Sequence, residues 1–103
     1  IKKIRTAGFD GNIAWPKHSL QRMLERGISR TEVKEAIMNG AVLEDYSNDY
    51  LFPSLLIGNV NFNKPLHVVA SYDEDFFKCY IIAAYIPNEK YFEKDLMTRK
   101  KDD

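Results

Sequence analysis

The sequence predicts an α+β fold in which helices come first and strands follow. Between residues 16 and 39, apolar residues recur at the three- and four-residue spacing of amphipathic helices. After Gly40 the period of the apolar residues changes to two, and short turn-forming segments separate the apolar runs. Consecutive strands joined by short turns pair antiparallel. We therefore expect two N-terminal helices packed on an antiparallel sheet of about four strands, with a short C-terminal helix.

The first helix is expected over residues 16–26. Pro16 suits the first helical turn, and Gly27 suits the left-handed position just past a helix end. The spacing of residues along this helix divides them between two faces. The face that we expect to enter the core carries Leu20, Met23, Leu24 and Gly27. The opposite face carries a basic stripe, which is formed by His18, Arg22 and Arg26.

The second helix is expected to begin at the capping box Ser29-Arg-Thr-Glu32, whose two end residues each satisfy a backbone donor of the other. It should end at Asn39-Gly40. Its apolar face is made of Val33, Ala36 and Ile37.

Segments rich in apolar residues predict four strands after this helix, over residues 41–46, 55–62, 66–72 and 77–86. A tight turn at Asn63-Lys64 joins the second strand to the third. The loose alternation of residues 1–6 favours an edge strand, and residues 89–97 are expected to form the C-terminal helix.

The chain is expected to be a single domain. Its 103 residues are enough for one hydrophobic core, which we place within 16–97, with 98–103 as a flexible tail. No apolar run approaches the roughly 20 residues of a membrane span, and the charged N-terminus lacks the apolar region of a secretory signal. The one cysteine, Cys79, cannot form an internal disulfide, so we expect a cytoplasmic protein with no membrane partner.

Charge is unevenly distributed although the net charge is zero. Residues 1–40 carry 8 Lys+Arg against 4 Asp+Glu, and residues 41–103 carry 7 against 11. The basic half can attract phosphate at one face of the protein, or the charges can simply keep a small domain in solution. A dedicated duplex-binding domain is normally basic overall, so the composition argues against one.

Metal and cofactor sites are not expected. The chain has two histidines and one cysteine, which are far apart, and it has no CxxC or HExxH spacing. It also lacks a glycine-rich phosphate loop and a Gly-x-Ser-x-Gly segment.

The basic stripe of His18, Arg22 and Arg26 is the best candidate for chemistry. Guanidinium groups bind phosphodiester oxygens bidentately, and an imidazole accepts a proton near neutral pH. The structural alternative is a solvated helix face. His67, in the middle of a strand, offers a second imidazole, which either packs inside the sheet or projects toward the stripe.

Four further residues could contact a nucleic acid. Tyr72 and Tyr85 could stack on bases, although aromatic residues in strands also serve as packing. Arg99 and Lys100 could reach a phosphate, although they also fit a disordered tail.

Several segments, taken in order over roughly residues 16–100, resemble an uncharacterised bacterial domain family. Its members read His-x3-Arg-Met-x2-Arg-Gly-Ile-Ser, then a Val-x2-Ala-Ile helix, a Tyr…Pro…Leu-x-Gly strand, a Pro-Leu-His-Val-Val strand, an Ile-Ile-x-x-Tyr-x-Pro strand and a terminal basic pair. The matching residues here are His18, Arg22-Met23, Arg26-Gly27-Ile28-Ser29, Val33, Ala36-Ile37, Pro53, Leu56, Gly58, Pro65 to Val69, Ile81-Ile82, Tyr85, Pro87 and Arg99-Lys100. That family is grouped with the RelE/ParE-type plasmid toxins and with BrnT-like toxins.

The resemblance implies a RelE-like fold and an mRNA-cleaving toxin that a cognate antitoxin holds in check. The expected activity is that of a metal-independent endoribonuclease, acting on free or ribosome-bound mRNA by attack of a ribose 2′-hydroxyl on the adjacent phosphate. His18 or His67 would accept the proton, and arginines would stabilise the developing charge: Arg22, Arg26 and Arg99. The alternative is a non-catalytic module that binds a protein partner or nucleic acid through the same basic face. Catalysis requires an imidazole and two arginines at one cleft, whereas binding needs only an exposed patch.

Overall fold

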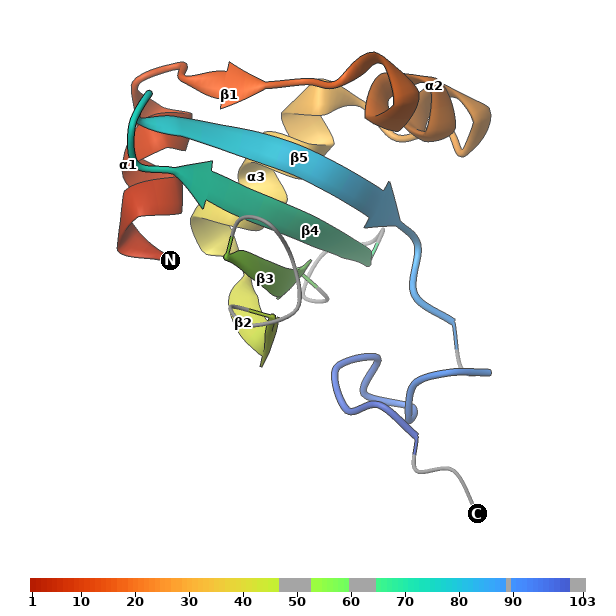
Figure 1. Ribbon diagram of the computed structural model, residues 1–103. Coiled ribbons are helices and arrows are strands. Elements are labelled where there is room, and N and C mark those ends of the chain that lie inside the picture. Colours follow the sequence, from red (N-terminus) through yellow and green to blue (C-terminus); the bar gives the residue numbers. More distant parts are fainter. Residues whose placement is uncertain (47–52, 60–64, 89, 101–103) are drawn as a thin grey trace.

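The computed structural model describes residues 1–46, 53–59, 65–88 and 90–100 and has the expected α+β fold (Figure 1). The elements of these residues follow in the order α1 (Lys2–Phe9), β1 (Ile13–Ala14), α2 (Lys17–Glu25), α3 (Arg30–Asn39), β2 (Ala41–Asp45), β3 (Ser54–Asn59), β4 (Leu66–Asp73) and β5 (Lys78–Tyr85). The predicted turn at Asn63-Lys64 lies outside the described residues. In the described part of the chain, no helix combines the length and the apolar character that crossing a membrane requires.

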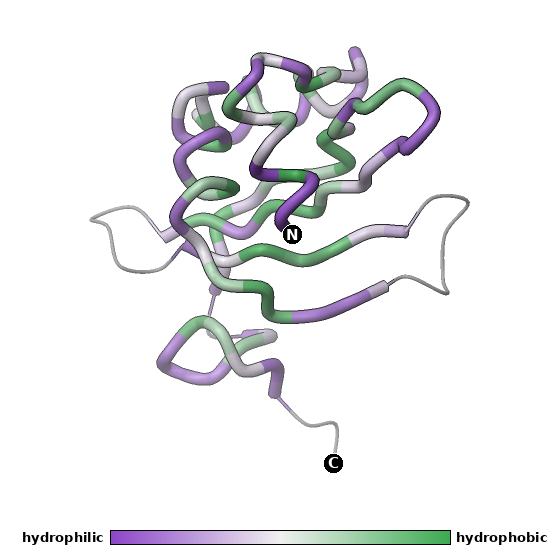
Figure 2. Tube along the Cα trace, turned by 90° about the vertical axis from the view of Figure 1, so that its left-hand side faces the viewer, coloured by the Kyte–Doolittle hydropathy of each residue, from purple (hydrophilic) through white to green (hydrophobic). Residues whose placement is uncertain are grey.

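The helices and the C-terminal segment lie on opposite sides of the sheet. α3 packs on β3 and β4, and α1 packs on β4 and β5. α2 lies beyond the end of β1 and packs against β5. Figure 2 shows the strands between the helices above and the C-terminal segment below. The core fills the space between the helices and the sheet, and its largest contributors are Met23, Ile37, Ile57 and Ile81.

The sheet is mixed and has the strand order β1-β5-β4-β3-β2, which corrects the prediction of a purely antiparallel sheet of about four strands. The four longer strands do pair antiparallel, as expected. The additional strand, β1, pairs parallel with β5 through Ile13↔Cys79 and Ala14↔Tyr80. A strand of two residues is too short to show the alternation on which the prediction depends.

The predicted turn between the helices and the start of α3 are confirmed. Gly27 has a φ of 68°, a left-handed conformation that costs glycine little. The Ser29 hydroxyl accepts from the Glu32 amide at 3.1 Å, and the Glu32 carboxylate accepts from the Ser29 amide at 2.9 Å, which completes the capping box. The predicted apolar face of α3 is also buried.

The N-terminal segment is a helix, so the prediction of an edge strand over residues 1–6 is wrong. Ile4 and Ala7, three residues apart, each have a relative exposure of 3% and lie in the core. Arg5 donates to the carbonyls of Ile37 and Gly40 at 3.1 and 2.6 Å, which satisfies acceptors at the end of α3. Because charged residues lie between the apolar ones, the three-residue spacing of Ile4 and Ala7 was not recognised as helical from the sequence.

The C-terminal segment, described for residues 90–100, forms turns and an isolated antiparallel bridge between Phe92 and Arg99, so the predicted helix over 89–97 is wrong. The Asp95 carboxylate accepts hydrogen bonds from the backbone amides of Met97 and Thr98, each at 2.9 Å. Such local bonds compete with helix formation. Leu96 accordingly takes a φ of 59°, outside the helical region.

α2 presents a different face to the sheet from the one predicted. Met23 is buried, with 2% relative exposure, but its neighbour Leu24 is 82% exposed. The polar Ser19 is also buried, and its hydroxyl donates to the Ile82 carbonyl at 2.9 Å. Arg26 donates to the Ala84 carbonyl at 2.8 Å. These two bonds to β5 turn the helix so that part of the expected basic stripe faces the sheet and Leu24 faces water.

Substitution of the two neighbours tests this orientation. Met23→Ala should lower the free energy of unfolding by about 2–5 kcal/mol because it empties a core position. Leu24→Ala should change it by less than about 0.5 kcal/mol because the side chain is exposed. Urea unfolding of both variants provides the measurement, and equal losses would contradict the orientation of α2.

Candidate functional site

A cleft of about 620 Å³ lies beyond the carboxyl end of β5, where α2, the end of that strand and the C-terminal segment meet. Its lining combines two arginines with three aromatic rings and two other side chains: Arg26, Tyr85, Ile86, Asn88, Tyr91, Phe92 and Arg99. Cations beside aromatic faces suit an anionic ligand that also carries flat rings.

Arg26 reaches the cleft from the C-terminal end of α2. The helix ends at Glu25, and the positive φ of Gly27 then turns the chain toward α3. One guanidinium nitrogen of Arg26 is held by the Ala84 carbonyl, one residue before Tyr85. The side chain is therefore fixed beside β5, and its other N–H groups are not used in that bond.

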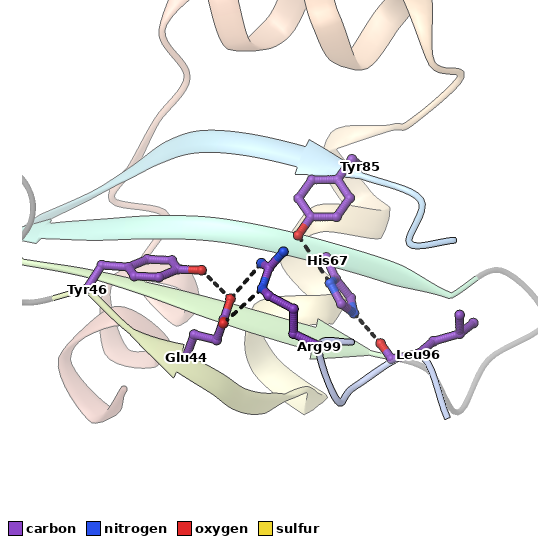
Figure 3. A network of polar contacts seen from close by, with 6 residues as sticks. All are labelled: Glu44, Tyr46, His67, Tyr85, Leu96 and Arg99. Carbon is purple, nitrogen blue, oxygen red and sulfur yellow. Dashed lines mark hydrogen bonds and ion pairs between the residues drawn. The ribbon is translucent and has the colours of Figure 1, made fainter. Parts of the chain in front are cut away.

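Arg99 reaches the cleft from the C-terminal segment and is bound to Glu44 of β2 (Figure 3). Its Nε and Nη2 donate to the two carboxylate oxygens at 3.1 and 2.8 Å, and its Cζ lies 4.8 Å from the centre of the Phe92 ring. The Tyr46 hydroxyl donates to the same carboxylate. The hydrogen bond from Arg99 holds the pKa of Glu44 below its ordinary value, so Glu44 is ionised at neutral pH. Burial, followed by the bond to Glu44, raises the pKa of Tyr46 to about 12.

A β-bulge brings Glu44 into this position. The register of β2 shifts between Val42 and Glu44, and such a bulge changes the face at which a side chain points. Leu43, inside the bulge, covers Gly58 of β3, where an added Cβ would lie 2.5 Å from Leu43 Cδ1 and 3.3 Å from His67 Cδ2. Glycine at this position therefore lets Leu43 and His67 approach each other.

His67 is fully buried behind the cleft, between Gly58 and Tyr85 on the neighbouring strands. Its Nε2 lies 2.6 Å from the Leu96 carbonyl, which can only accept, so Nε2 carries the proton. Nδ1 then accepts from the Tyr85 hydroxyl at 3.3 Å. Burial lowers the pKa of His67, although the bond to Leu96 opposes the shift, so the ring is neutral at neutral pH. Its faces and edges also contact the rings of Tyr85 and Phe92.

Tyr85 connects His67 to the cleft. Burial raises the pKa of its hydroxyl above the ordinary value, and the positive charge of Arg99 opposes that rise. The hydroxyl therefore stays protonated at neutral pH and donates toward His67. Figure 3 shows the Arg99 guanidinium between the Glu44–Tyr46 pair and the Tyr85–His67 pair.

The structure brings together four of the eight residues predicted from the sequence. Arg26, Tyr85 and Arg99 line the cleft, and His67 lies directly behind it. The other four do not line it. His18 and Arg22 are exposed on α2, Tyr72 lines a different hollow near Lys3 and Asp73, and the backbone amide of Lys100 donates to the Tyr91 carbonyl.

Sequence reasoning missed six residues of the site: Glu44, Tyr46, Ile86, Asn88, Tyr91 and Phe92. The adjacent aromatic pair Tyr91-Phe92, just after a strand that ends in Pro87, was a signal that could have been used. Nothing in the local sequence distinguishes Glu44 from an ordinary exposed carboxylate.

Metal ligands do not gather anywhere in the described ranges, where no three His, Cys, Asp or Glu side chains are placed to hold an ion. The Cys79 thiol is buried, and burial raises its pKa to about 12, which makes it a poor nucleophile.

Stability should fall as the pH is lowered from about 6.5 toward 5, because the unfolded chain takes up a proton that buried His67 resists. His67→Gln should remove most of this slope, and His18→Gln, at an exposed position, should leave it in place. The lowered pKa of Glu44 contributes only below its ordinary value of 4.5, outside this range. Urea unfolding at several pH values measures the slope, and a wild-type slope in His67→Gln would show that His67 is not the group responsible.

Comparison with known proteins identifies a family for most of the chain. Residues 15–86 match the family described as Domain of unknown function (DUF4258), a range that runs from just before α2 to just after β5. The matched range includes Arg26, His67 and Tyr85, but the C-terminal segment that carries Arg99 lies beyond it. No curated protein and no solved structure matches the chain. Because the match covers well over half of the sequence, the protein belongs to the DUF4258 family of domains of unknown function.

Proposed function

We propose that the protein is a metal-independent endoribonuclease of the RelE-like toxin type, with a RelE-like fold, that binds single-stranded RNA in the cleft. The observation that carries this proposal is the convergence of Arg26, Arg99 and Tyr85 on one cleft, with His67 bonded to Tyr85. Guanidinium groups match the oxygens of a phosphodiester, and the half-exposed ring of Tyr91 offers a base a stacking surface. The substrate is mRNA, free or on the ribosome, and a cognate antitoxin restrains the activity.

The proposed reaction is attack of a ribose 2′-hydroxyl on the adjacent phosphate. The 2′-oxygen forms a bond to phosphorus, and the bond to the 5′-oxygen of the next nucleotide breaks, which leaves a 2′,3′-cyclic phosphate and a 5′-hydroxyl. Tyr85 takes the proton of the 2′-hydroxyl as it passes its own proton to Nδ1 of His67, and water protonates the leaving oxygen. Arg26 and Arg99 stabilise the charge of the phosphorane.

Binding without cleavage is the second candidate, and the burial of His67 favours it. Both ring nitrogens of His67 are engaged, and the ring has no exposed surface, so it cannot touch a ribose directly. In this alternative, the arginines and aromatic rings of the cleft bind nucleic acid or a protein partner, and no bond is broken.

The three arginines provide a matched test of the ribonuclease proposal. Arg26→Ala and Arg99→Ala should each lower single-turnover RNA cleavage by about 10²-fold or more, the scale of losing one charge-stabilising donor. Arg22→Ala, which removes the same charge from the exposed face of α2, should change little. Arg→Lys should restore only part of the rate because a point charge cannot replace a fork of donors.

Stability and binding are measured on the same variants. Arg26→Ala should also cost about 1 kcal/mol of stability, since it removes the hydrogen bond to Ala84. Wild-type protein that cleaves neither free nor ribosome-bound RNA contradicts the enzyme proposal. If that protein still binds RNA in an Arg99-dependent manner, binding without cleavage takes its place. Co-expression with the product of a neighbouring gene tests for the antitoxin.

Removal of one hydroxyl tests the proton path. Tyr85→Phe keeps the ring that lines the cleft but breaks the link to His67, so cleavage should fall by about 10²-fold, the contribution of a positioned acid–base group. RNA affinity should change much less. Tyr72→Phe, at a tyrosine outside the cleft, is the control and should be fully active. Full activity of Tyr85→Phe would exclude this path.

A further inference from the structure

We propose that Glu44 and Tyr46 are positioning residues that hold the Arg99 guanidinium in place, so that it presents its remaining donors to a phosphate group in the cleft. The inference deepens the proposed function, since it concerns phosphate binding at the same cleft, but its test does not require cleavage. Neither residue lines the cleft, so each acts through Arg99.

Glu44 fixes the edge of the guanidinium. A guanidinium has five N–H donors in one plane, and Glu44 engages the edge formed by Nε and Nη2, at 3.1 and 2.8 Å. Glu44 therefore makes no bond to the N–H groups on the Nη1 side of the guanidinium. Arg99 lines the cleft, and Figure 3 places its guanidinium between Glu44 and Tyr85. The donors that Glu44 does not engage therefore lie on the side of Tyr85, which also lines the cleft.

The face and the backbone of Arg99 are fixed as well. The guanidinium lies over the ring of Phe92, which is 3% exposed and packs edge-on against buried His67. The backbone of Arg99 forms a bridge with Phe92, and the bonds from Glu93 to Thr98 and from Lys100 to Tyr91 close the turn on both sides. A phosphate would thus meet an arginine that is already ordered.

Tyr46 fixes Glu44 in turn. Its hydroxyl donates to the carboxylate oxygen that also receives Nη2 of Arg99, which favours one orientation of the carboxylate. Because the pKa of Glu44 is lowered and Tyr46 stays protonated, all three groups hold the charges that this arrangement needs at neutral pH. The opposite role, in which Glu44 competes with phosphate for Arg99, makes the opposite prediction for Glu44→Gln.

The test is a titration of the full chain with inorganic pyrophosphate, followed by NMR at the Nε–H of Arg99. In the wild type, this signal should shift and saturate. Glu44→Gln should weaken the affinity about tenfold, the value of one ordinary hydrogen bond. Tyr46→Phe, which keeps the carboxylate, should weaken it less. Asp45→Asn removes the same charge one residue away on β2 and should match the wild type.

A double-mutant cycle separates positioning from a general structural role. If Glu44 acts through Arg99, Glu44→Gln should have no further effect on pyrophosphate affinity, or on RNA cleavage, in an Arg99→Ala background. Affinity in all four members of the cycle is measured by titration calorimetry, because Arg99→Ala has no Nε–H signal at this position. Thermal melts identify any variant that has lost its fold, in which case Tyr46→Phe provides the comparison.

Three outcomes overturn the positioning role: no shift of Arg99 in the wild type, equal or tighter binding by Glu44→Gln, or additive losses in the cycle. Glu44-dependent binding of pyrophosphate by a protein that cleaves no RNA supports the positioning role and rejects the ribonuclease.

Discussion

The hydrogen bond from His67 to the Leu96 carbonyl is the contact on which the candidate site depends. It is 2.6 Å long and buried, and it attaches the C-terminal segment to the side of the sheet opposite α1 and α3. Phe92 packs against the same imidazole. Three of the residues that line the cleft, Tyr91, Phe92 and Arg99, belong to this segment. Together with the ion pair between Arg99 and Glu44, the contact to His67 therefore holds one wall of the cleft and one of its two arginines in place.

The parts of the fold that could be predicted are those encoded by local sequence. The capping box at Ser29 and the apolar spacing of α3 require only neighbours a few residues apart, and both are present in the structure. The alternation of apolar residues in β4 also depends on neighbours alone, and it places Leu66 and Val68 in the core and His67 on the opposite face. β1 was missed because its two residues gain their strand geometry only by pairing with β5.

The candidate site could be predicted residue by residue but not as an arrangement. Arg26 and Arg99 were each recognisable as phosphate-binding side chains, yet they meet only because the C-terminal segment returns to the end of β5. The expected grouping of Arg26 with His18 and Arg22 assumed that α2 faces water on that side. The bond from Arg26 to Ala84 shows that tertiary contacts decide its rotation. Glu44 depends on a bulge, which a period-two pattern cannot reveal.

The pairing of Arg99 with Glu44 has a consequence for the kinetics of association. Two opposite charges a hydrogen bond apart largely cancel at a distance, so an approaching anion experiences little more than the field of Arg26. The net charge of the whole chain is zero, because the basic excess of residues 1–40 is offset by the acidic excess of residues 41–103, so the chain adds no overall attraction. Long-range steering toward this cleft is therefore weak, and encounters should occur at about the 10⁵–10⁶ M⁻¹s⁻¹ of uncharged partners. Ligands should then be distinguished by their dissociation rates rather than by their association rates.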